Sequence, residues 1–243
     1  METPNTNCFK IRLHDSLQRA TFTFRTVHIR KHQHVYVCGD VADSVYFIES
    51  GHVKLLMLSP EGKECLLNIQ TAGDTFGELC LAESGPRRET AIAMENTRLK
   101  RLACSNFFRH LSENSLVEGF VHYLAARVAD QQQVIANLIT VDSEHRLAET
   151  LLTLARKLGH PNPFSTRIEH KITHEELAEM VGTTRPRITA FMLDFRARGL
   201  IEITPEHFLI IKEKKLTDYL GKPRLQQPQI SRAPQTLSEI VQY

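Results

Sequence analysis

Basic and hydroxyl side chains gather in the segment 171–189 of the sequence. An Arg guanidinium can donate two hydrogen bonds to a phosphate or to the edge of a guanine, and Lys and Thr side chains bind phosphate oxygens. Donors of these types around one helical unit predict contact with double-stranded DNA. The candidate DNA-binding residues are Lys171, Thr173, Thr183, Thr184, Arg185, Arg187 and Thr189.

The elements that must position these donors are two helices with a tight joint. Thr173 and Glu176 have the spacing of a capping box, which starts the first helix, and Gly182 can take the left-handed conformation that ends it. Thr184 is a candidate cap of the second helix, and Pro186 is tolerated in its first turn. Two helices joined by a short turn that contains Gly predict a helix-turn-helix, whose second helix enters the major groove of DNA.

Helical periodicity divides the second helix into two faces. The predicted inner face comprises Ile188, Phe191, Met192 and Phe195. The predicted outer face comprises Pro186, Thr189, Ala190 and Leu193. A hairpin of residues 200–203 and 208–211 is expected to follow as a wing. An ordinary helical hairpin of an interaction domain is the alternative, and the surrounding cations favour DNA binding.

Short strands are predicted in the N-terminal half. Alternating apolar runs such as 45–48 and 53–58 are separated by turn residues, and glycines recur every 11 or 12 residues, at Gly39, Gly51, Gly62 and Gly73. This spacing predicts hairpins stacked into a roll. The predicted fold class is therefore α+β, with a double-stranded β-helix of the jelly-roll kind at residues 21–112 as a sensor domain, after an N-terminal segment at 1–20.

Apolar residues at steps of three and four predict one long helix over residues 113–141. Its heptad seam comprises Val121, Leu124, Val128, Gln131, Ile135 and Leu138. The β-branched residues at a positions and the leucines at d positions favour a parallel two-stranded coil, in which the polar Gln131 resembles a register-setting residue. We therefore expect a homodimer. A long helix packed on its own β domain is the alternative.

Length and composition limit the remaining choices. The 243 residues suffice for two domains, and 42% hydrophobic and 24% charged residues suit a chain that buries real cores. No apolar run reaches the roughly 18 residues of a membrane span, and the acidic start does not suit a signal peptide. We expect a cytoplasmic location and no membrane partner.

The C-terminal part differs in charge and composition. Residues 143–243 carry 15 Lys and Arg against 12 Asp and Glu, a weak basic bias where the DNA contacts are predicted. A winged helix-turn-helix domain is expected at 142–221. The tail 222–243 is rich in Pro, Gln and Ser, so it is expected to be disordered.

Cysteine and histidine positions do not predict a metal site. The five cysteines are widely spaced, which favours reduced thiols; Cys80 is either a small buried hydrophobe, the commoner case, or an oxidant sensor. His28, His32 and His34 would share one face of a strand, where a solvated polar face is commoner than a metal or haem site. No paired acid and base, nucleophile elbow or phosphate-binding loop appears, so we expect no enzyme.

Two sets of motifs together resemble one known family. The segments 39–55 (GDVADSVYFIESGHVKL) and 73–79 (GDTFGEL) resemble the cyclic-nucleotide-binding β-roll of the CRP/FNR family of bacterial transcription regulators. The long helix and the segment 171–185 (KITHEELAEMVGTTR) resemble the dimer helix and winged helix-turn-helix of that family. The resemblance extends over about residues 25 to 220, with the motifs in the family's order.

The resemblance implies an effector site. In the family, backbone N–H groups of a short helix, an acid for the ribose hydroxyl and an arginine for the phosphate form a cassette, and Gly77, Glu78, Leu79 and Arg88 match these roles. Thr90 matches a hydroxyl role, and Gln131 and Gln132 align with purine contacts. Glu89 departs from the family's Ser or Thr. A cyclic nucleotide is thus a candidate effector, and a roll with another effector or none is the alternative; no other cofactor is assigned.

The family's iron–sulfur branch needs a cysteine cluster near the N-terminus, where Cys8 stands alone, so that branch is excluded. The resemblance implies a homodimeric, sequence-specific regulator on a palindromic DNA site, with RNA polymerase as a partner. Arg185 matches the family's guanine contact, whereas Pro186 and Ala190 replace two charged base readers of its best-known member. A nucleotide-binding regulatory subunit that acts on a protein partner is the alternative function.

Overall fold

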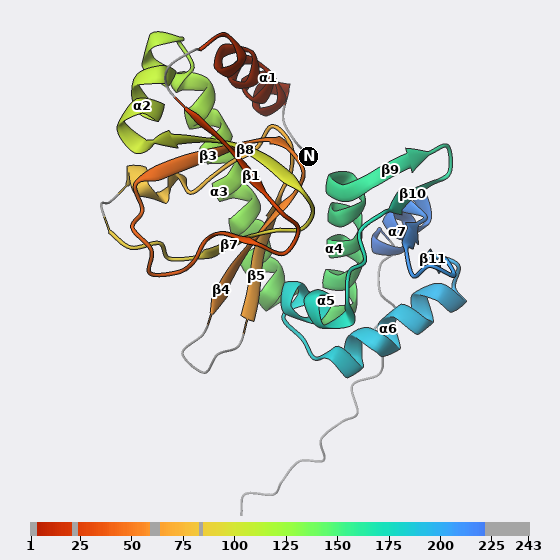
Figure 1. The fold of residues 1–243 in the computed structure, drawn as a ribbon. Helices are drawn as coiled ribbons and strands as arrows, with labels where there is room; N and C mark the ends of the chain where they lie inside the picture. The colour runs from red at the N-terminus through yellow and green to blue at the C-terminus, as the bar shows by residue number, and fades with distance from the viewer. Residues whose placement is uncertain (1–3, 21–23, 59–63, 83–84, 222–243) are drawn as a thin grey trace, which may run out of the picture.

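The computed structural model describes residues 4–20, 24–58, 64–82 and 85–221 (Figure 1). A β-roll occupies the N-terminal part, and a long helix leads from it to a smaller C-terminal part. The N-terminal part and the long helix comprise α1 (Pro4–Arg19), β1 (Arg25–Ile29), β2 (His34–Tyr36), β3 (Ser44–Ser50), β4 (Val53–Leu58), β5 (Glu64–Gln70), β6 (Thr75–Phe76), the 3-10 helix η1 (Glu78–Leu81), β7 (Thr90–Ala93), β8 (Thr97–Ala103), α2 (Cys104–Glu113) and α3 (Val117–Thr140). The C-terminal part comprises α4 (Ser143–Leu158), β9 (Gly159–Asn162), β10 (Ser165–Ile168), α5 (His174–Val181), α6 (Arg185–Ala197), β11 (Ile201–Ile203), β12 (Leu209–Ile211) and α7 (Glu213–Leu220).

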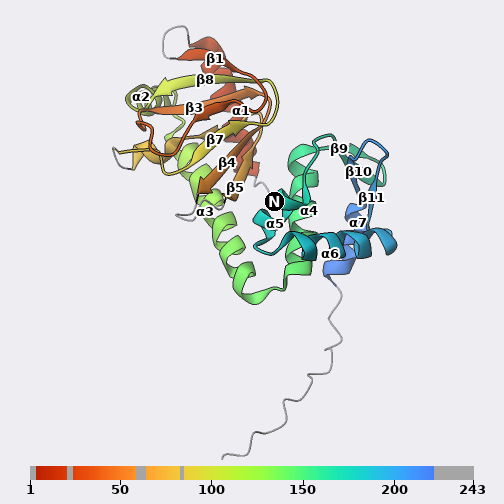
Figure 2. The same ribbon diagram turned by 60° about the horizontal axis from the view of Figure 1, so that its bottom comes forward.

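Two four-stranded antiparallel sheets form the roll, with the orders β1-β8-β3-β6 and β2-β7-β4-β5 (Figure 2). Alternate side chains of each strand point between the sheets because successive residues face opposite sides. The residues buried there are Tyr36, Tyr46, Ile48, Val53, Leu55, Phe76, Ala91 and Leu99. Gly51 makes the turn after β3 with a φ of 93°, and a Cβ at this position would lie 2.8 Å from Thr97 Cα.

Three helices pack together on the roll, and two of them, α1 and α2, were not predicted from the sequence. Phe9, Leu13 and Leu17 of α1 are buried against α2 and the start of α3. These three residues recur at steps of four, so one face of residues 4–19 is apolar and the segment forms a helix. Figure 1 shows α1 lying beside α2 and α3.

The C-terminal part of helix α3 extends beyond the roll (Figure 2). Phe120 and Tyr123 are buried against the roll, whereas Val128 and Ile135 are 50% and 59% exposed. Of the other predicted seam residues, Val121, Gln131 and Leu138 are exposed and Leu124 is half-buried. The seam is therefore an open apolar stripe in the single chain.

The C-terminal part has its own sheet, with the order β11-β12-β10-β9, covered by helices α4 to α7. Its core continues into the roll, because Leu56, Leu66 and Ile69 of β4 and β5 belong to the same buried cluster. Polar contacts add to this junction: Lys157 Nζ donates to Asn68 Oδ1 over 2.6 Å and to the Ile69 carbonyl over 2.9 Å. The α+β fold class, with a β-roll, a long helix and a winged helix-turn-helix, is confirmed.

Some details differ from the sequence-based expectations. No strand was predicted at residues 159–162, but Gly159–Asn162 form β9, which pairs with β10. His28 lies in β1, His32 in a turn with a φ of 66° and His34 in β2, so the three histidines share no strand face. The tail 222–243 falls outside the described residues. Among the described residues, no helix is long and apolar enough to cross a membrane.

Candidate DNA-binding surface and effector cassette

Helix α5, the first helix of the helix-turn-helix, begins with a capping box at Thr173, which confirms the prediction. Thr173 Oγ1 accepts a hydrogen bond from the N–H of Glu176 over 3.1 Å, and Glu176 Oε2 accepts one from the N–H of Thr173 over 3.0 Å. Glu176 also pairs with Lys54 of β4 at 3.0 Å. Burial raises the pKa of the Glu176 carboxyl, but the hydrogen bonds from Thr173 and Lys54 outweigh it and lower the pKa. The start of α5 is therefore held to the roll.

The side chain of Arg146, in α4, binds the backbone of the turn between α5 and α6. Gly182 ends α5 with a φ of 67°, as predicted. The Nε of Arg146 donates to the carbonyl of Val181 over 2.8 Å, and one Nη donates to the carbonyl of Gly182 over 3.4 Å. The other Nη donates to the carbonyl of Val141, directly after α3. One side chain thus links the end of the long helix to the helix-turn-helix.

Helix α6 has the two faces that its periodicity predicts. The buried residues are Ile188, Met192 and Phe195, and Phe191 is half-buried. Pro186, Ala190 and Leu193 are exposed. The helix lies at the outer edge of the C-terminal part (Figure 1). The wing follows as predicted, because β11 and β12 pair around a turn in which the N–H of Thr204 donates to the carbonyl of Phe208 over 2.9 Å.

Most of the predicted DNA-binding side chains are exposed, either just before α5 or at the start of α6. Lys171, Thr173, Thr184, Arg185 and Arg187 are exposed, and Thr183 is half-buried. Thr184 occupies the N-cap position, although its side chain makes no capping hydrogen bond.

Thr189 is placed differently from the other candidates. It is half-buried; its Oγ1 donates to the carbonyl of Arg185 over 3.1 Å and hydrogen-bonds with His174 Nδ1 at 2.9 Å. Its hydroxyl therefore already has protein partners.

One of the surface arginines of α6 and its C-terminal end also has a protein partner, since Arg198 pairs with Asp194 at 2.8 Å. Arg185 and Arg187 are thus the exposed guanidinium groups at the start of the recognition helix.

The predicted cassette begins where β6 meets η1. Gly77 has a φ of 78°, and a Cβ at this position would lie 2.8 Å from Arg87 Nη1 and 3.1 Å from the Ser44 carbonyl oxygen. Glycine is therefore required here by both conformation and space. Glu78 and Leu79 follow as the first residues of η1, and Leu79 is 48% exposed.

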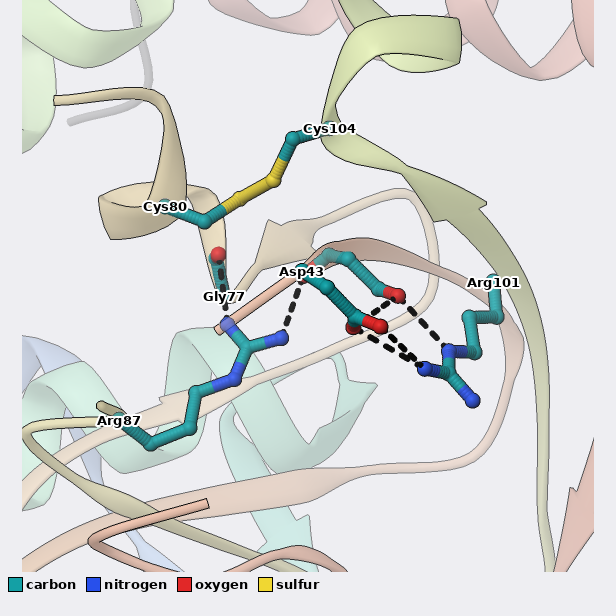
Figure 3. Close-up of a disulfide and its surroundings, with 7 residues drawn as sticks. Asp43, Gly77, Cys80, Arg87, Arg101 and Cys104 are labelled. Carbon is teal, nitrogen blue, oxygen red and sulfur yellow. Dashed lines mark hydrogen bonds and ion pairs between the residues drawn. A yellow bond between two sulfur atoms is a disulfide. The ribbon is translucent and has the colours of Figure 1, made fainter. Parts of the chain in front are cut away.

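Arg87 points towards Gly77 in the interior of the roll (Figure 3). Its guanidinium donates to the carbonyl oxygens of Gly77 over 2.8 Å and Ser44 over 2.5 Å, and it lies 4.3 Å from the ring centre of Tyr36. Arg87 is 5% exposed, whereas Arg88 is exposed. Arg88, to which the sequence assigned the phosphate role, therefore does not face this interior, and its role stays a prediction.

The alternation of an extended chain explains why Arg87 is buried and Arg88 is exposed. Arg87, Glu89 and Ala91 are buried on one side, and Arg88 between them is on the other. The parity of the buried alanines in β7 was the available signal in the sequence. Thr90 is also buried, and its Oγ1 accepts a hydrogen bond from the N–H of Cys38 over 3.0 Å.

A buried carboxyl group, that of Glu89, and a half-buried one, that of Glu78, lie in the same interior. Glu78 pairs with Arg127 of α3 at 2.9 Å, and Glu89 accepts a hydrogen bond from the Tyr36 hydroxyl over 2.8 Å. Burial raises the pKa of Glu89, and the negative charge of Glu78 raises it further, against the Tyr36 hydrogen bond and the positive charges of Arg127 and Arg87. An anionic effector would meet both acids as well as the two arginines.

Gln131 and Gln132, the predicted purine contacts, lie on the exposed part of α3. In a single chain they face solvent.

A disulfide joins the cassette to α2 (Figure 3). Cys80 of η1 is bonded to Cys104, which lies 24 residues later in the sequence and begins α2. The expectation of reduced thiols is wrong for this pair. Strand β3 pairs with both β6 and β8, so β6 and β8 run in the same direction, and the segments after them, η1 and α2, meet at one edge of the sheet. The free cysteines among the described residues, Cys8, Cys38 and Cys65, are exposed.

The β-roll, the long helix and the helix-turn-helix define a class of effector-controlled, DNA-binding regulators. Comparison with known families agrees with both halves: residues 26–114 match the cyclic nucleotide-binding domain, and residues 145–219 match the Crp-like helix-turn-helix domain.

Curated relatives are transcription regulators. The CRP-like cAMP-activated global transcriptional regulator of Mycobacterium tuberculosis is 33% identical over 185 residues, which cover 75% of this chain and 82% of that protein. The global nitrogen regulator of Synechocystis sp. is 29% identical over 180 residues, which cover 72% of this chain and 80% of that protein. The chain belongs to the CRP/FNR family of DNA-binding transcription regulators, which confirms the resemblance seen in the sequence.

Solved structures have the same fold. A CRP-family transcriptional regulator from Thermus thermophilus has a TM-score of 0.68 and 25% identity, covering 81% of this chain and 97% of that one. A c-di-GMP responsive global regulator from Xanthomonas campestris has a TM-score of 0.69 and 20% identity, covering 82% of this chain and 99% of that one.

Proposed function

We propose that this regulator binds a palindromic DNA site as a homodimer and that an anionic small molecule in the β-roll controls the binding. The observation that carries the DNA-reading part is the open face of α6, where Arg185 and Arg187 are exposed beside Pro186 and Ala190. Arg185 at the start of the helix reads a guanine, and the small apolar groups at Pro186 and Ala190 meet thymine methyls. Lys171 and Thr173 bind phosphates and orient the helix.

Dimerisation through α3 is supported by its open apolar stripe. Val121, Val128, Ile135 and Leu138 are between 46% and 59% exposed in the single chain, at the heptad spacing of a two-stranded coil. A second copy covers this stripe. The two recognition helices then face successive major grooves, with half-sites about 10 base pairs apart.

The effector part of the proposal assigns the phosphate to Arg87. This guanidinium is buried at the N-terminus of η1 and binds two carbonyl oxygens, which a phosphate can replace with stronger, charge-assisted hydrogen bonds. The relative from Mycobacterium is cAMP-activated, and the structural neighbour from Xanthomonas is c-di-GMP responsive. A cyclic nucleotide is therefore the effector class to test first for this chain.

The proposal includes a physical link from the cassette to the DNA-binding surface. Glu78 of η1 pairs with Arg127 of α3, and Arg146 binds the backbone at the end of α3 and at the end of α5. An effector that competes for Glu78 therefore shifts α3, and α3 shifts the helix-turn-helix. We further infer action in the cytoplasm, contact with RNA polymerase, and no catalytic step.

Calorimetry of full-length protein with cAMP, cGMP and c-di-GMP tests the effector assignment. Arg87→Leu should abolish binding of the active nucleotide, and the matched variant Arg88→Leu, which removes the same charge from the surface, should keep it. Retained binding in Arg87→Leu with loss in Arg88→Leu would reverse the assignment. A parent protein that binds none of the three at millimolar concentration would remove cyclic nucleotides from the proposal.

The rival function, a nucleotide-binding subunit that acts on a protein partner, differs in its affinity for DNA. The regulator proposed here binds duplex DNA with an affinity that falls steeply with salt, because phosphate contacts release counterions. A protein-directed subunit has no such affinity, so fluorescence anisotropy with labelled duplexes at two salt concentrations separates the two functions.

A further inference from the structure

Two histidines and a glutamate meet where the roll contacts the C-terminal part. His52 lies in the turn between β3 and β4, Glu95 in the turn between β7 and β8, and His170 between β10 and α5. His52 Nδ1 is 2.5 Å from Glu95 Oε1, and His170 Nε2 is 3.6 Å from Glu95 Oε2. One nitrogen or oxygen atom from each residue lies within 4.8 Å of the other two. Three common metal ligands from distant parts of the sequence are thus gathered at one point.

The backbone holds these side chains in place. The N–H of Met94 donates to the carbonyl of His52 over 2.9 Å, and Thr97 Oγ1 donates to the same carbonyl over 3.3 Å. The two turns that carry His52 and Glu95 are therefore bound to each other. His170 follows Ile168, which is fully buried in the core of the C-terminal part. The site is built on regular structure on both sides of the junction.

Hydrogen bonds within the protein leave one nitrogen atom of this cluster without a partner. The Nδ1 atom of His170 is buried and has no hydrogen-bond partner. A neutral imidazole that binds an ion through one nitrogen carries its proton on the other, so an ion held at Nε2, which faces Glu95, leaves the proton on this Nδ1. The side chains of His52 and His170 are 22% and 17% exposed, so the imidazoles are largely shielded from solvent.

We propose that His52, Glu95 and His170 bind one divalent transition-metal ion, with Zn²⁺ the first candidate, and that this ion fastens the DNA-binding part to the roll. Imidazole and carboxylate are preferred ligands of such ions, and three protein ligands with one position open to water form a common zinc set. Tetrahedral ligands at about 2.0–2.2 Å from the ion lie roughly 3.4 Å from each other. The present separations need side-chain shifts of about 1 Å to reach this geometry.

The location of the site gives the ion a defined mechanical role. Two ligands belong to the roll, and the third, His170, directly precedes Lys171 and lies close in sequence to Thr173. Both of these residues carry proposed phosphate contacts. A bound ion therefore restrains the segment that leads into the helix-turn-helix, in addition to the Lys54–Glu176 ion pair. Metal binding itself does not depend on the proposed DNA or effector contacts.

Titration with Co²⁺ tests the site, because its visible absorption reports on the geometry and the ligand types of the ion. The experiment uses the full chain with any affinity tag removed. We expect one Co²⁺ per chain with the spectrum of nitrogen and oxygen ligands and no thiolate charge-transfer band, and displacement by Zn²⁺. His52→Gln, Glu95→Gln and His170→Gln should each weaken binding at least about 100-fold, since even the loss of an outer-shell partner costs about 10–100-fold.

A matched control is available on the same part of the chain. His160 Nε2 is 3.5 Å from Glu169 Oε2, so this pair has the same chemistry but is exposed and forms no cluster of three with a further ligand among the described residues. His160→Gln should leave the affinity for Co²⁺ unchanged. A parent-like affinity in His170→Gln, or equal losses in His160→Gln and His170→Gln, would overturn the proposal.

Hydrogen exchange distinguishes an ion that bridges the roll and the C-terminal part from an ion that is bound by the C-terminal part alone. Zn²⁺ should slow amide exchange in residues 169–174 of the parent protein at least about tenfold, but not in His52→Gln, where the removed ligand lies on the other part of the molecule. Slowing of the same size in His52→Gln would show that the roll contributes no ligand and would contradict the proposal.

Discussion

The side chain of Leu138, the last residue of the predicted α3 seam, touches Gly182, the residue that ends α5. A Cβ at Gly182 would lie 2.9 Å from Leu138 Cδ2. The surface proposed for dimerisation and the turn of the helix-turn-helix are therefore in direct contact. A movement of α3 can therefore reach the recognition helix in two ways, through this contact and through the hydrogen bonds of Arg146.

Gly182→Ala tests this contact. The substitution should lower the free energy of unfolding by about 1–2 kcal/mol, because an alanine in the left-handed conformation is strained. Part of the loss should come from crowding against Leu138, so the double variant Gly182→Ala/Leu138→Ala should lose less than the sum of the two single losses. Urea denaturation of the four proteins measures this. Strict additivity would mean that the contact contributes nothing.

Dimerisation is predicted to depend on the α3 stripe. Val128→Glu/Ile135→Glu places carboxylates in the paired core, where an unpaired charge costs several kcal/mol, so the dimer dissociation constant should rise at least about 100-fold. Analytical ultracentrifugation measures the change. Ala129→Glu/Gln133→Glu adds two acids to the opposite side of the helix and should remain dimeric. Identical sedimentation of the seam variant and the parent protein would place the dimer interface elsewhere.

The Cys80–Cys104 disulfide predicts a count of thiols and a loss of stability. Alkylation in denaturant should modify three cysteines of the five before reduction and all five after it. Breaking the link should lower the free energy of unfolding by about 3 kcal/mol, because the unfolded chain gains freedom. Cys104→Ser should have the same effect, and Cys65→Ser, at an exposed free cysteine, should have almost none. Five reactive thiols before reduction would contradict the disulfide.

Glu89 predicts a pH dependence. Because burial raises its pKa above the unfolded value, the folded state binds the proton more tightly, and this group makes the protein less stable as the pH rises through its folded pKa. Glu89→Gln should therefore unfold at a higher temperature than the parent at pH 7. The difference should shrink as the pH falls towards the unfolded pKa of a glutamate, about 4.3. A difference that grows in acid would mean that the pKa of Glu89 is lowered.

Local signals in the sequence predicted the C-terminal part well. The capping box at Thr173, the left-handed Gly182 and the exposed Pro186, Ala190 and Leu193 of α6 all depend on spacings of a few residues, and the structure has each of them. The same reasoning did not predict α1, whose apolar residues Phe9 and Leu13 gain their significance only from α2 and α3.

Long-range proximity was the part that the sequence did not reveal. Cys80 and Cys104 meet because β6 and β8 lie on either side of β3, and His52, Glu95 and His170 meet because the C-terminal part packs against the roll. The choice between Arg87 and Arg88 was different in kind. The sequence shows that Arg87 and Ala91 share one side of an extended chain, but it does not show how β7 pairs with β4, and this pairing puts that side in the interior of the roll.

Sequence-specific reading of DNA by the start of α6 is the central claim, and selection of bound duplexes from random sequence tests it most directly. The parent protein should select a palindrome with one guanine per half-site and half-sites about 10 base pairs apart. Arg185→Ala should lose the preference at that guanine, a discrimination of about 1–3 kcal/mol. Lys171→Ala should weaken binding to all sequences and lower the salt slope by about one unit. An unchanged preferred sequence in Arg185→Ala, with affinity lost uniformly, would contradict the claim.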